Sequence, residues 1–597
     1  MKYQCIEDLG SALSEKFPQA DVPVGWSIEP ELCPQNMEGD LTVNCFRFAR
    51  VFKSSPDKIS DAAVEYLQSH ADVETAEKIK AFVNITLKPQ AVMRDVAAVI
   101  GNLENSAKLE ESQRRRVLIE YSAPNTNKPQ HLGHVRNNTL GMSLASLLRR
   151  VGHDIIEINL VNDRGIHICK SMLAYERFGD GVTPESTGIK GDHLVGSFYV
   201  KYNDALKAEL DELRVAKPEL AGESDEDLFL KTEIGQATQK MLQDWEADVP
   251  EVRALWKKMN SWVFTGFDET YKRMGIKFNH TYLESETYLL GKDLVADGLE
   301  RGVFQKREDG AVFADLGKMG QKVVLRSDGT SVYITQDIGT TLKKYEDYKP
   351  QEQVWVVGDE QILHFKMLFA IIKKMGYEWA DDLYHMAYGM VNLPTGKMKS
   401  REGTVVDADD LFDEMTELAK QAAAERDASL SGEELEERSA IIGMGALKFM
   451  LLKFNPKTTI MFDPQASVKF EGDTGPYVQY ACARINSIMR KAVERGFEIT
   501  DDLNRSELCA PEEKALAIVA SQYPSVLQAA ADKKDCSTVV SYLLDLAKAF
   551  NRFYRECPVL NAGDDDLISA RLSMCVSVRN VLADGLKTLT IDVPDAM

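Results

Sequence analysis

The chain has 597 residues, of which 44% are hydrophobic and 27% are charged, and its formal net charge is −22 at pH 7. This length predicts about three to five globular domains, each with a buried core of its own. The acidic balance argues against broad, nonspecific binding to nucleic acid, because a polyphosphate-binding surface normally carries excess positive charge, although it leaves room for a local basic face.

Cysteine usage and hydropathy narrow the class of protein further. The nine cysteines are scattered singly from Cys5 to Cys575 without a CxxC pair, which is typical of reduced thiols and predicts neither a disulfide framework nor a zinc site. Apolar stretches are interrupted well before the roughly 20 residues that a membrane-spanning helix needs. The N-terminus has the pattern of an amphipathic helix rather than of a signal peptide. We therefore expect a cytoplasmic protein with no membrane partner.

Residues 1–112 are expected to form a separate α+β domain. Its first segment, MKYQCIEDLGSALSEKF, has apolar residues at helical spacing. The later run AFVNITLKP alternates like a strand and is closed by Pro89. The polar stretch ENSAKLEESQ then marks the end of this domain.

Residues 113–407 have the pattern of a parallel α/β domain. The run RVLIEYSAP has the length of a strand, VRNNTLGMSLASLLRRVG has the spacing of a helix that ends at Gly152, and DIIEINLVND follows as a second strand. This βαβ order predicts a parallel sheet with a ligand site at the carboxyl ends of its strands. Acidic, Trp-containing helices at about 178–318 are expected as an insertion, before strand-like segments resume at QKVVLRSDGTSVYIT and EQVWVVGD.

The rest of the chain is expected to be helical. Acidic, Ala-rich runs such as DEMTELAKQAAAERDASLSGEELEERS characterise a connecting region at 408–465. Residues 466–597 are expected to form a helical C-terminal domain. Neither part shows an internal repeat or a low-complexity tail.

His131 and His134 stand where the first helix of the βαβ unit is expected to begin. Free N–H groups and the helix dipole favour an anion at such a position, and phosphate is the natural candidate. Gly133 lets the backbone approach a ribose or a flat ring, and the imidazoles can donate hydrogen bonds to phosphoryl oxygens. The plainer interpretation is that both histidines are turn and cap residues. Zinc ligation is disfavoured, because no further nitrogen or sulfur ligands lie at a recognisable spacing.

A second element that suits phosphate is the stretch GKMKSREGTVV, which contains Lys397, Lys399 and Arg401. A small cationic loop of this kind can close on a polyphosphate and neutralise a leaving pyrophosphate. Taken alone, the stretch would be a solvated turn. Two such elements, one opening and one closing the α/β region, favour a nucleotide site.

The two motifs HLGH and KMKSR resemble the HIGH and KMSKS signatures of class I aminoacyl-tRNA synthetases. Around them, SAPNTNKPQHLGHVRN, RSDGTSVYITQDIG, VVGDEQILHF and EGDTGPYVQYACARINSIMRKA are similar to the arginyl-tRNA synthetase family, from the N-terminal domain to the last residue. This resemblance implies a multidomain α/β protein with a Rossmann-type parallel-sheet catalytic domain, an α+β N-terminal domain that contacts tRNA, and an all-α C-terminal anticodon-binding domain. It also implies L-arginine, ATP with Mg and tRNA(Arg) as substrates, and no protein-bound zinc.

The resemblance further implies which residues bind arginine. Tyr333, Asp337 and Gln361 would meet the guanidinium group, while Glu120 and Asn125 would hold the amino-acid backbone. The chemistry agrees, because a guanidinium that leaves water needs carboxylates and planar hydrogen-bonding partners. Without the resemblance, Asp337 would be interpreted as a helix N-cap and Tyr333 as a core residue.

The lysine-rich motif departs from the family pattern. ATP binding is implied for His131, Gly133, His134 and Lys397, and catalysis for His131, His134, Lys397, Lys128 and Arg401. In KMKSR, however, Lys399 stands in the third position instead of Ser, and Ser400 in the fourth instead of Lys. A shifted lysine does not necessarily reach the same phosphate oxygen. Family members with an imperfect loop resemble one another in having a lysine just before the HIGH element, so we expect Lys128 to replace the missing charge.

Tyr477, Tyr480 and Arg484 lie together in the C-terminal stretch GPYVQYACARINSIMRKA. Exposed rings beside cations suit single-stranded RNA, because unstacked bases stack on the rings while phosphates meet the charges. The plainer interpretation is a core helix with one basic face. The resemblance implies that these three residues, with Tyr554 and the terminal Met597, lie near the anticodon loop.

These observations predict an enzyme that joins L-arginine to tRNA(Arg) through an arginyl-adenylate. The resemblance implies a monomer. Two alternatives stay open. A small-molecule nucleotidyltransferase would share the strand, the HxGH loop and the helix, but is usually short. A non-catalytic RNA-binding relative would be expected to have lost the histidines or Asp337.

Overall fold

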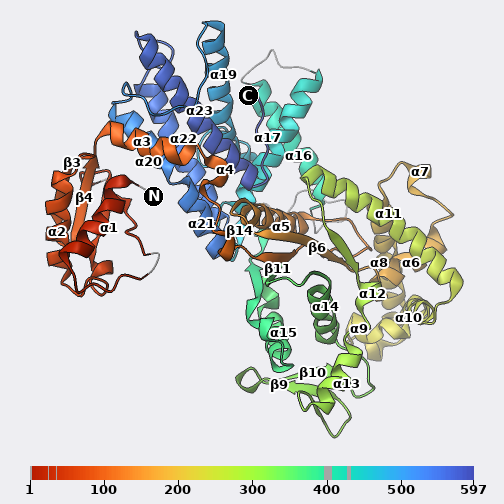
Figure 1. The fold of residues 1–597 in the computed structure, drawn as a ribbon. Helices are drawn as coiled ribbons and strands as arrows, with labels where there is room; N and C mark the ends of the chain where they lie inside the picture. The colour runs from red at the N-terminus through yellow and green to blue at the C-terminus, as the bar shows by residue number, and fades with distance from the viewer. Residues whose placement is uncertain (1–2, 24–25, 35, 395–405, 426–431) are drawn as a thin grey trace.

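The computed structural model describes residues 3–23, 26–34, 36–394, 406–425 and 432–597. In Figure 1 the N-terminal domain, drawn in red and orange, stands to one side of the helical C-terminal region in blue, and the α/β region lies below the latter. The described residues contain four sheets, of which the largest has five strands. No helix within these ranges has both the length and the apolar composition to cross a bilayer.

The N-terminal domain combines helices with an antiparallel sheet of strand order β1-β2-β4-β3. Its elements are α1 (Gln4–Lys16), β1 (Glu31–Leu32), β2 (Leu41–Asn44), α2 (Pro56–Ser69), β3 (Val73–Ile79) and β4 (Phe82–Leu87). Helix α2 begins where the side chain of Ser55 accepts a hydrogen bond from the backbone N–H of Lys58, with Pro56 in the first helical position. Helices α3 (Pro89–Ile100) and α4 (Leu103–Ser106) lead onward to the α/β region. The expected α+β N-terminal domain is confirmed.

The central sheet has five parallel strands in the order β12-β11-β5-β6-β7. They are β5 (Arg116–Glu120), β6 (Asp154–Val161), β7 (His280–Leu283), β11 (Glu352–Gly358) and β12 (Leu383–Tyr388). Helix α5 (Leu132–Arg150) connects β5 to β6, while α14 (Tyr333–Tyr348) precedes β11 and α15 (Ile362–Lys374) follows it. The parallel sheet expected from the βαβ pattern is confirmed, and the carboxyl ends of β5 and β11 lie side by side.

Residues 178–318 differ from a single continuous insertion. Helix α6 (Ile166–Phe178) precedes this region, and further helices fill its first part: α7 (Pro184–Thr187), α8 (Gly191–Ala216), α9 (Asp225–Leu228), α10 (Glu233–Glu246) and α11 (Pro250–Met274). Strand β7 then pairs with β6 and so belongs to the central sheet. With only four residues, two of them exposed, β7 lacks the alternation that makes a strand visible in a sequence. Helices α12 (Glu284–Thr287) and α13 (Lys292–Glu300) follow it.

The stretch QKVVLRSDGTSVYIT is strand-like only at its start. Strand β10 (Gln321–Leu325) pairs with β9 (Val312–Asp315), which pairs with β8 (Gln305–Lys306), in a separate antiparallel sheet. Tyr333 instead begins α14, where Ile334, Ile338 and Leu342 recur at helical spacing and are buried. Packing of this face overrides the β-branched composition of the run.

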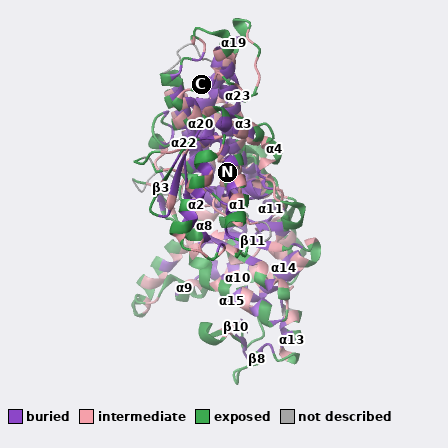
Figure 2. Cartoon of the chain, turned by 60° about the vertical axis from the view of Figure 1, so that its left-hand side comes forward, coloured by how far each residue is buried: buried purple, intermediate pink, exposed green. Residues whose placement is uncertain are grey.

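The C-terminal part is helical, as expected. Its helices are α16 (Ala408–Ala424), α17 (Gly432–Leu452), α18 (Pro464–Ser467), α19 (Gly475–Glu494), α20 (Pro511–Ser521), α21 (Tyr523–Lys533), α22 (Ser537–Glu556) and α23 (Asp565–Thr588). Figure 2 shows buried residues concentrated along α19, α20, α22 and α23. The short strands β13 (Val391–Asn392) and β14 (Ile460–Met461) pair in parallel. The buried Lys448 of α17 donates hydrogen bonds to the carbonyl oxygens of Met274, at 2.8 Å, and Thr590, at 2.7 Å, and so joins the α/β region to the C-terminal helices.

Candidate active site

The candidate site lies at the carboxyl ends of β5 and β11, which are neighbours in the central sheet. The loop after β5 leads into α5, and the two histidines of the HLGH motif lie at this junction, His131 as the N-cap residue and His134 in the first turn of the helix. Strand β11 ends at Gly358, and a short 3-10 turn at Asp359–Gln361 leads into α15. The fold therefore brings two of the predicted site segments to one edge of the sheet.

His131 and His134 form a reciprocal cap at the start of α5. His131 is the N-cap residue, and its Nδ1 accepts a hydrogen bond from the backbone N–H of Gly133 at 3.1 Å. Nδ1 of His134 accepts one from the backbone N–H of His131 at 3.2 Å. A neutral imidazole that accepts at Nδ1 carries its proton on Nε2. The cap therefore leaves each ring with an Nε2–H donor that the helix itself does not use.

The environment keeps both imidazoles uncharged in the free protein. Burial and then the ammonium of Lys128 lower the pKa of His131 to about 4. Burial, His131 and Lys128 hold the pKa of His134 well below its usual value. The two ring centroids lie 4.0 Å apart. An anion at this loop would therefore meet two neutral imidazole donors and a nearby lysine, rather than two imidazolium ions.

Gly133 leaves room for the first imidazole. A Cβ atom at this position would lie 2.9 Å from Cε1 and 3.1 Å from Nδ1 of His131. A side chain at Gly133 would therefore require the ring of His131 to shift from its capping position. In the free protein, this crowding explains the glycine more directly than the approach of a ribose does.

The chain that follows the lysine-rich motif returns to the histidine loop. The backbone N–H of Leu132 donates to the carbonyl oxygen of Val406 at 2.9 Å. His131 and Asp407 form an antiparallel β-bridge. The lysine-rich motif itself, with Lys397, Lys399 and Arg401, lies outside the described residues. The roles of those three side chains stay predictions.

Glu120, at the end of β5, has a buried partner that the sequence analysis did not find. Its carboxylate accepts a hydrogen bond from Lys344 Nζ of α14, and the two side chains are 10% and 2% exposed. The ammonium also lies 5.7 Å from the ring centroid of Trp355. The available signal was spacing, since Lys344 stands two helical turns after Asp337 on the same helix. Any ligand group that Glu120 meets shares it with Lys344.

Asp337 also has a partner that the sequence analysis missed. Its Oδ2 lies 2.7 Å from Nε2 of His364, which stands in the first turn of α15. The contact joins α14 to α15 close to Gln361, and the side chains of Asp337 and His364 are 37% and 21% exposed. The N-cap of α14 is Val332, so Asp337 is not a helix cap.

The other three predicted arginine-site residues, Tyr333, Asn125 and Gln361, are exposed. Tyr333 is 78% exposed and stands one turn before Asp337, so it is not a core residue. Asn125 is exposed, and its backbone forms a parallel bridge with Asn162 after β6. Their side chains are therefore accessible to a ligand.

The predicted RNA-binding residues gather around Arg484 of α19. Its Nη1 donates to Oδ1 of Asn551 at 2.9 Å, and Nδ2 of Asn551 donates to the hydroxyl of Tyr477 at 2.8 Å. The guanidinium lies 4.7 Å from the ring centroid of Tyr480 and 5.3 Å from that of Tyr554. Met597 and Tyr480 pack against the same small hydrophobic cluster. All five residues therefore come together on one side of the helical domain.

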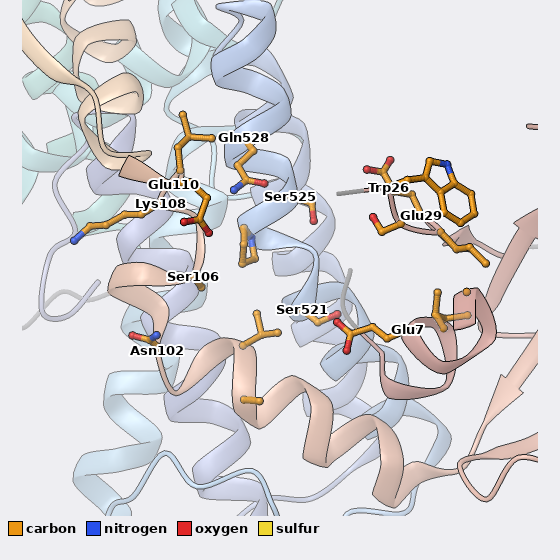
Figure 3. A pocket seen from close by; sticks show the side chains of 18 of the residues that line it. Glu7, Trp26, Glu29, Asn102, Ser106, Lys108, Glu110, Ser521, Ser525 and Gln528 are labelled. Atoms are coloured by element: carbon orange, nitrogen blue, oxygen red, sulfur yellow. The ribbon is translucent and has the colours of Figure 1, made fainter. Parts of the chain in front are cut away.

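A large cavity lies away from the predicted catalytic residues. It measures about 1250 Å³ and lies between α1, the segment around α4, and α21. Figure 3 shows the side chains of Glu7, Glu110 and Ser521 at this cavity, with Trp26 at its margin. None of the predicted catalytic or arginine-binding residues is among the residues that line it.

Comparisons with known proteins agree with this arrangement. Residues 96–463 match the family model for tRNA synthetases class I (R), catalytic domain. Residues 4–87 match the arginyl tRNA synthetase N terminal domain, and residues 478–597 match the DALR anticodon binding domain. The match over the parallel sheet and its histidine pair, followed by a helical domain of this type, shows that the chain is a class I aminoacyl-tRNA synthetase.

Its relatives identify the family more closely. The arginine–tRNA ligases of Phocaeicola vulgatus and Porphyromonas gingivalis are each 42% identical to the chain, over 98% and 100% of its length and 98% and 99% of theirs. Among solved structures, Thermus thermophilus arginyl-tRNA synthetase has a TM-score of 0.80 at 25% identity, with 100% of both chains covered. An arginyl-tRNA synthetase from Plasmodium falciparum, at 18% identity and a TM-score of 0.75, shares the fold. The chain belongs to the arginyl-tRNA synthetase family.

Proposed function

We propose that this arginine–tRNA ligase activates arginine at the carboxyl ends of β5 and β11. A carboxylate oxygen of L-arginine attacks the α-phosphorus of MgATP, the bond to the β-phosphate oxygen breaks, and pyrophosphate leaves. The arginyl group then passes from the adenylate to tRNA(Arg), and AMP is released. The observation that carries this proposal is the reciprocal histidine cap, which presents two Nε2–H donors at the N-terminus of α5.

The histidines are proposed to act by hydrogen bonding to phosphate oxygens. Negative charge grows on these oxygens as the pyrophosphate leaves, and preorganised donors stabilise such charge without reorganising. Because both rings are neutral in the free protein, no proton needs to move for them to donate. Gly133 keeps His131 in place, while Lys128, Lys397 and Arg401 are proposed to supply positive charge near the leaving group. Positioning and electrostatics carry this step without a general base.

Arginine is proposed to lie between the α14–α15 contact and the end of β5. Asp337, held by His364, would meet the guanidinium together with Tyr333 and Gln361. At the other end, Glu120 and Asn125 would hold the amino-acid backbone. The buried ammonium of Lys344 pairs with the carboxylate of Glu120 and balances its charge.

The remaining regions are proposed to bind tRNA. Residues 1–112 would contact the tRNA body, residues 113–407 form the catalytic domain, and residues 408–465 connect it to the anticodon-binding domain at 466–597. In that last domain, Tyr477, Tyr480, Arg484, Tyr554 and Met597 would lie near the anticodon loop. Mg enters with ATP, and we propose a cytoplasmic monomer without bound zinc.

A matched set of histidine variants tests the proposal. His131→Ala and His134→Ala should each lower the single-turnover rate of adenylate formation by roughly a hundredfold to a thousandfold, as loss of a preorganised oxyanion donor does. The control is His153→Ala, because Nδ1 of His153 also accepts a backbone N–H, from Arg115 at 3.0 Å, but beyond the far end of α5. That variant should keep the wild-type rate. Equal rates for all three variants would contradict the proposed role of the cap.

A further inference from the structure

An ion cluster joins α8 to α16 beside the histidine loop. It consists of Lys190, Asp192, His193, Asp407 and Asp409, which we call the α16 clamp. Lys190 Nζ lies 2.6 Å from Asp409 Oδ2 and 3.2 Å from Asp192 Oδ2. His193 Nε2 lies 3.4 Å from Asp407 Oδ2 and 3.5 Å from Asp409 Oδ2. The side chain of Asp192 is fully buried, and the side chains of Lys190, Asp407 and Asp409 are 14–15% exposed.

The clamp supplies its own cation. Asp192, His193 and Asp409 have the spacing of a metal site. The ammonium of Lys190, however, already stands between the two carboxylates. A divalent ion there would face this ammonium in a site of low dielectric, which is strongly unfavourable. The cluster is therefore an ion-pair network rather than a metal site. Its role depends on the segments that it joins, which include the first turn of α16.

Helix α11 contributes to the same network. Lys190 Nζ donates to Oγ1 of Thr270 at 2.6 Å. The guanidinium of Arg273 lies 3.2 Å from Oδ1 of Asp409 and also reaches Asp413, at 2.6 Å. The first turn of α16 is thus tied to two helices of the α/β region by charged contacts.

The clamp is directly connected to the histidine loop through the backbone. Asp407 caps α16, since its Oδ1 accepts the backbone N–H of Asp409 at 2.8 Å. The same residue forms the β-bridge with His131. The neighbouring residues pair as well, since the backbone N–H of Ala408 donates to the carbonyl oxygen of Gln130 at 3.0 Å. A displacement of the first turn of α16 would therefore move the main chain of His131.

Helix α8 itself also packs against the histidine loop. A Cβ atom on Gly196, one turn after His193, would lie 2.9 Å from Cδ of Pro129. The helix and the loop are therefore in close contact, which leaves little freedom between the clamp and the segment that precedes His131.

We propose that the α16 clamp positions the catalytic histidines. Lys190 and His193 hold the two aspartates at the start of α16, and the backbone pairing passes this constraint to His131, whose Nε2–H must point at a phosphate oxygen. The residues of the clamp are positioning residues, because they reach the reacting atoms only through the histidine loop. The inference rests on the proposed role of His131 in adenylation.

The charge of His193 gives the clamp a pH dependence. Burial lowers the pKa of His193, but the carboxylates of Asp409, Asp407 and Asp192 outweigh burial and the opposing charge of Lys190, and raise this pKa above its ordinary value. A raised pKa means that the charged contact is complete below about pH 6.5 and is lost as the pH rises through the raised value. The clamp should therefore loosen on the alkaline side.

The test compares adenylate formation in single-turnover experiments with tRNA present. His193→Asn and Lys190→Met should lower this rate by about tenfold to a hundredfold, the effect of a small misplacement of a catalytic group. The KM for arginine should change less than about twofold, because the clamp does not touch the proposed arginine site. Lys190→Arg keeps the cation and should recover most of the rate.

Two controls separate positioning from general damage. His70→Asn breaks another His–Asp pair, with Asp8 at 3.2 Å, in the N-terminal domain, and should leave the rate unchanged. His193→Asn should also flatten the alkaline decline of the rate, which a purely structural defect would not do. His131→Ala is measured in parallel, and a wild-type rate for it would overturn the proposed function rather than the clamp.

The outcomes are distinct. The clamp is supported if His193→Asn and Lys190→Met slow adenylation, Lys190→Arg restores it, and the pH profile flattens. It is overturned if His131→Ala is severe while His193→Asn keeps both the wild-type rate and the wild-type pH profile. It is equally overturned if Lys190→Arg is as slow as Lys190→Met while both retain the melting temperature of the wild type.

Discussion

Replacing Asp337 by alanine removes the carboxylate that we expect to bind the guanidinium of arginine. Asp337 stands on the first turns of α14 and is oriented by His364, whose Nε2 lies 2.7 Å from its Oδ2. The hydrogen bond leaves the other carboxylate oxygen for the substrate. Asp337→Ala should therefore weaken the binding of arginine and leave the binding of ATP nearly unchanged.

The structure sets the size of this effect. A hydrogen bond to a charged group contributes about 1.5–3 kcal/mol. The side chain of Asp337 is 37% exposed, so water screens part of this interaction. A loss of about 1–2 kcal/mol follows, which corresponds to an increase of about fivefold to thirtyfold in the KM for arginine. His364→Ala should raise the KM by a smaller factor, because it frees the carboxylate without removing it.

The assay is arginine-dependent exchange of pyrophosphate into ATP, measured with saturating tRNA over a range of arginine concentrations. Asp347→Ala is the matched control, because Asp347 lies on the same helix, is 29% exposed and pairs with Lys343 at 2.5 Å. It should leave the KM for arginine unchanged. A normal KM for Asp337→Ala, or an equal rise for Asp347→Ala, would refute the assignment.

Three further predictions test the lysines near the leaving group, the tRNA-binding residues and the neutral His131. Lys128→Ala and Lys397→Ala should each slow adenylate formation in single turnovers by about a hundredfold or more, and Lys399→Ala only mildly; a silent Lys128→Ala beside a severe Lys399→Ala would show that the lysine-rich loop supplies both charges. Tyr554→Ala should weaken binding of tRNA by about 1–3 kcal/mol in equilibrium titrations, as loss of a stacked base does, without slowing adenylation. The pKa of His131 is about 4 in the folded chain, below the value of about 6.5 for a free histidine, so the unfolded chain binds more protons between these values. The free energy of unfolding should therefore fall as the pH drops from about 6.5 to 4, and His131→Asn should reduce that slope in denaturant titrations; an identical slope would contradict the burial of the neutral ring.

The local pattern of the sequence was sufficient to predict the βαβ unit at the centre of the parallel sheet. The strand, the helix that ends before Gly152 and the next strand follow one another without interruption, and the right-handed βαβ connection leaves little choice of topology. The histidines could be placed at the helix start for the same reason. Strand β7 could not be found in this way, because its pairing partner β6 precedes it by more than a hundred residues and its own four residues carry no alternation.

The partners of the site residues depend on packing between distant elements. Lys344 meets Glu120 only because α14 lies against the end of β5, and His364 meets Asp337 only because α14 and α15 flank the same strand. The helical spacing that puts Lys344 on the same face of α14 as Asp337 was visible in the sequence, but the partner that each residue meets was not. The reciprocal cap is different, since a histidine three residues after another at a helix start can satisfy two backbone N–H groups, which is recognisable once the helix boundary is known.

For the lysine-rich motif, the sequence was more informative than the described structure. Its composition indicated a phosphate-binding loop, whereas the described structure adds only that the following residues, from Val406 onward, pair with the histidine loop. That pairing supports a shared site for the two motifs. The α16 clamp was not visible in the sequence, because its members come from segments about two hundred residues apart.

The most direct test of the central claim is aminoacylation of a tRNA(Arg) transcript by the purified chain with MgATP and one amino acid at a time. Arginine, lysine and citrulline form the decisive set, because citrulline keeps the shape of arginine while a neutral urea group replaces the guanidinium. The account predicts charging with arginine, with lysine and citrulline rejected by several orders of magnitude, because neither side chain offers Asp337 and the other proposed guanidinium-binding groups a planar cation with matching hydrogen-bond donors. Charging with citrulline at a rate close to that with arginine, or hydrolysis of ATP without charging of the tRNA, would contradict it.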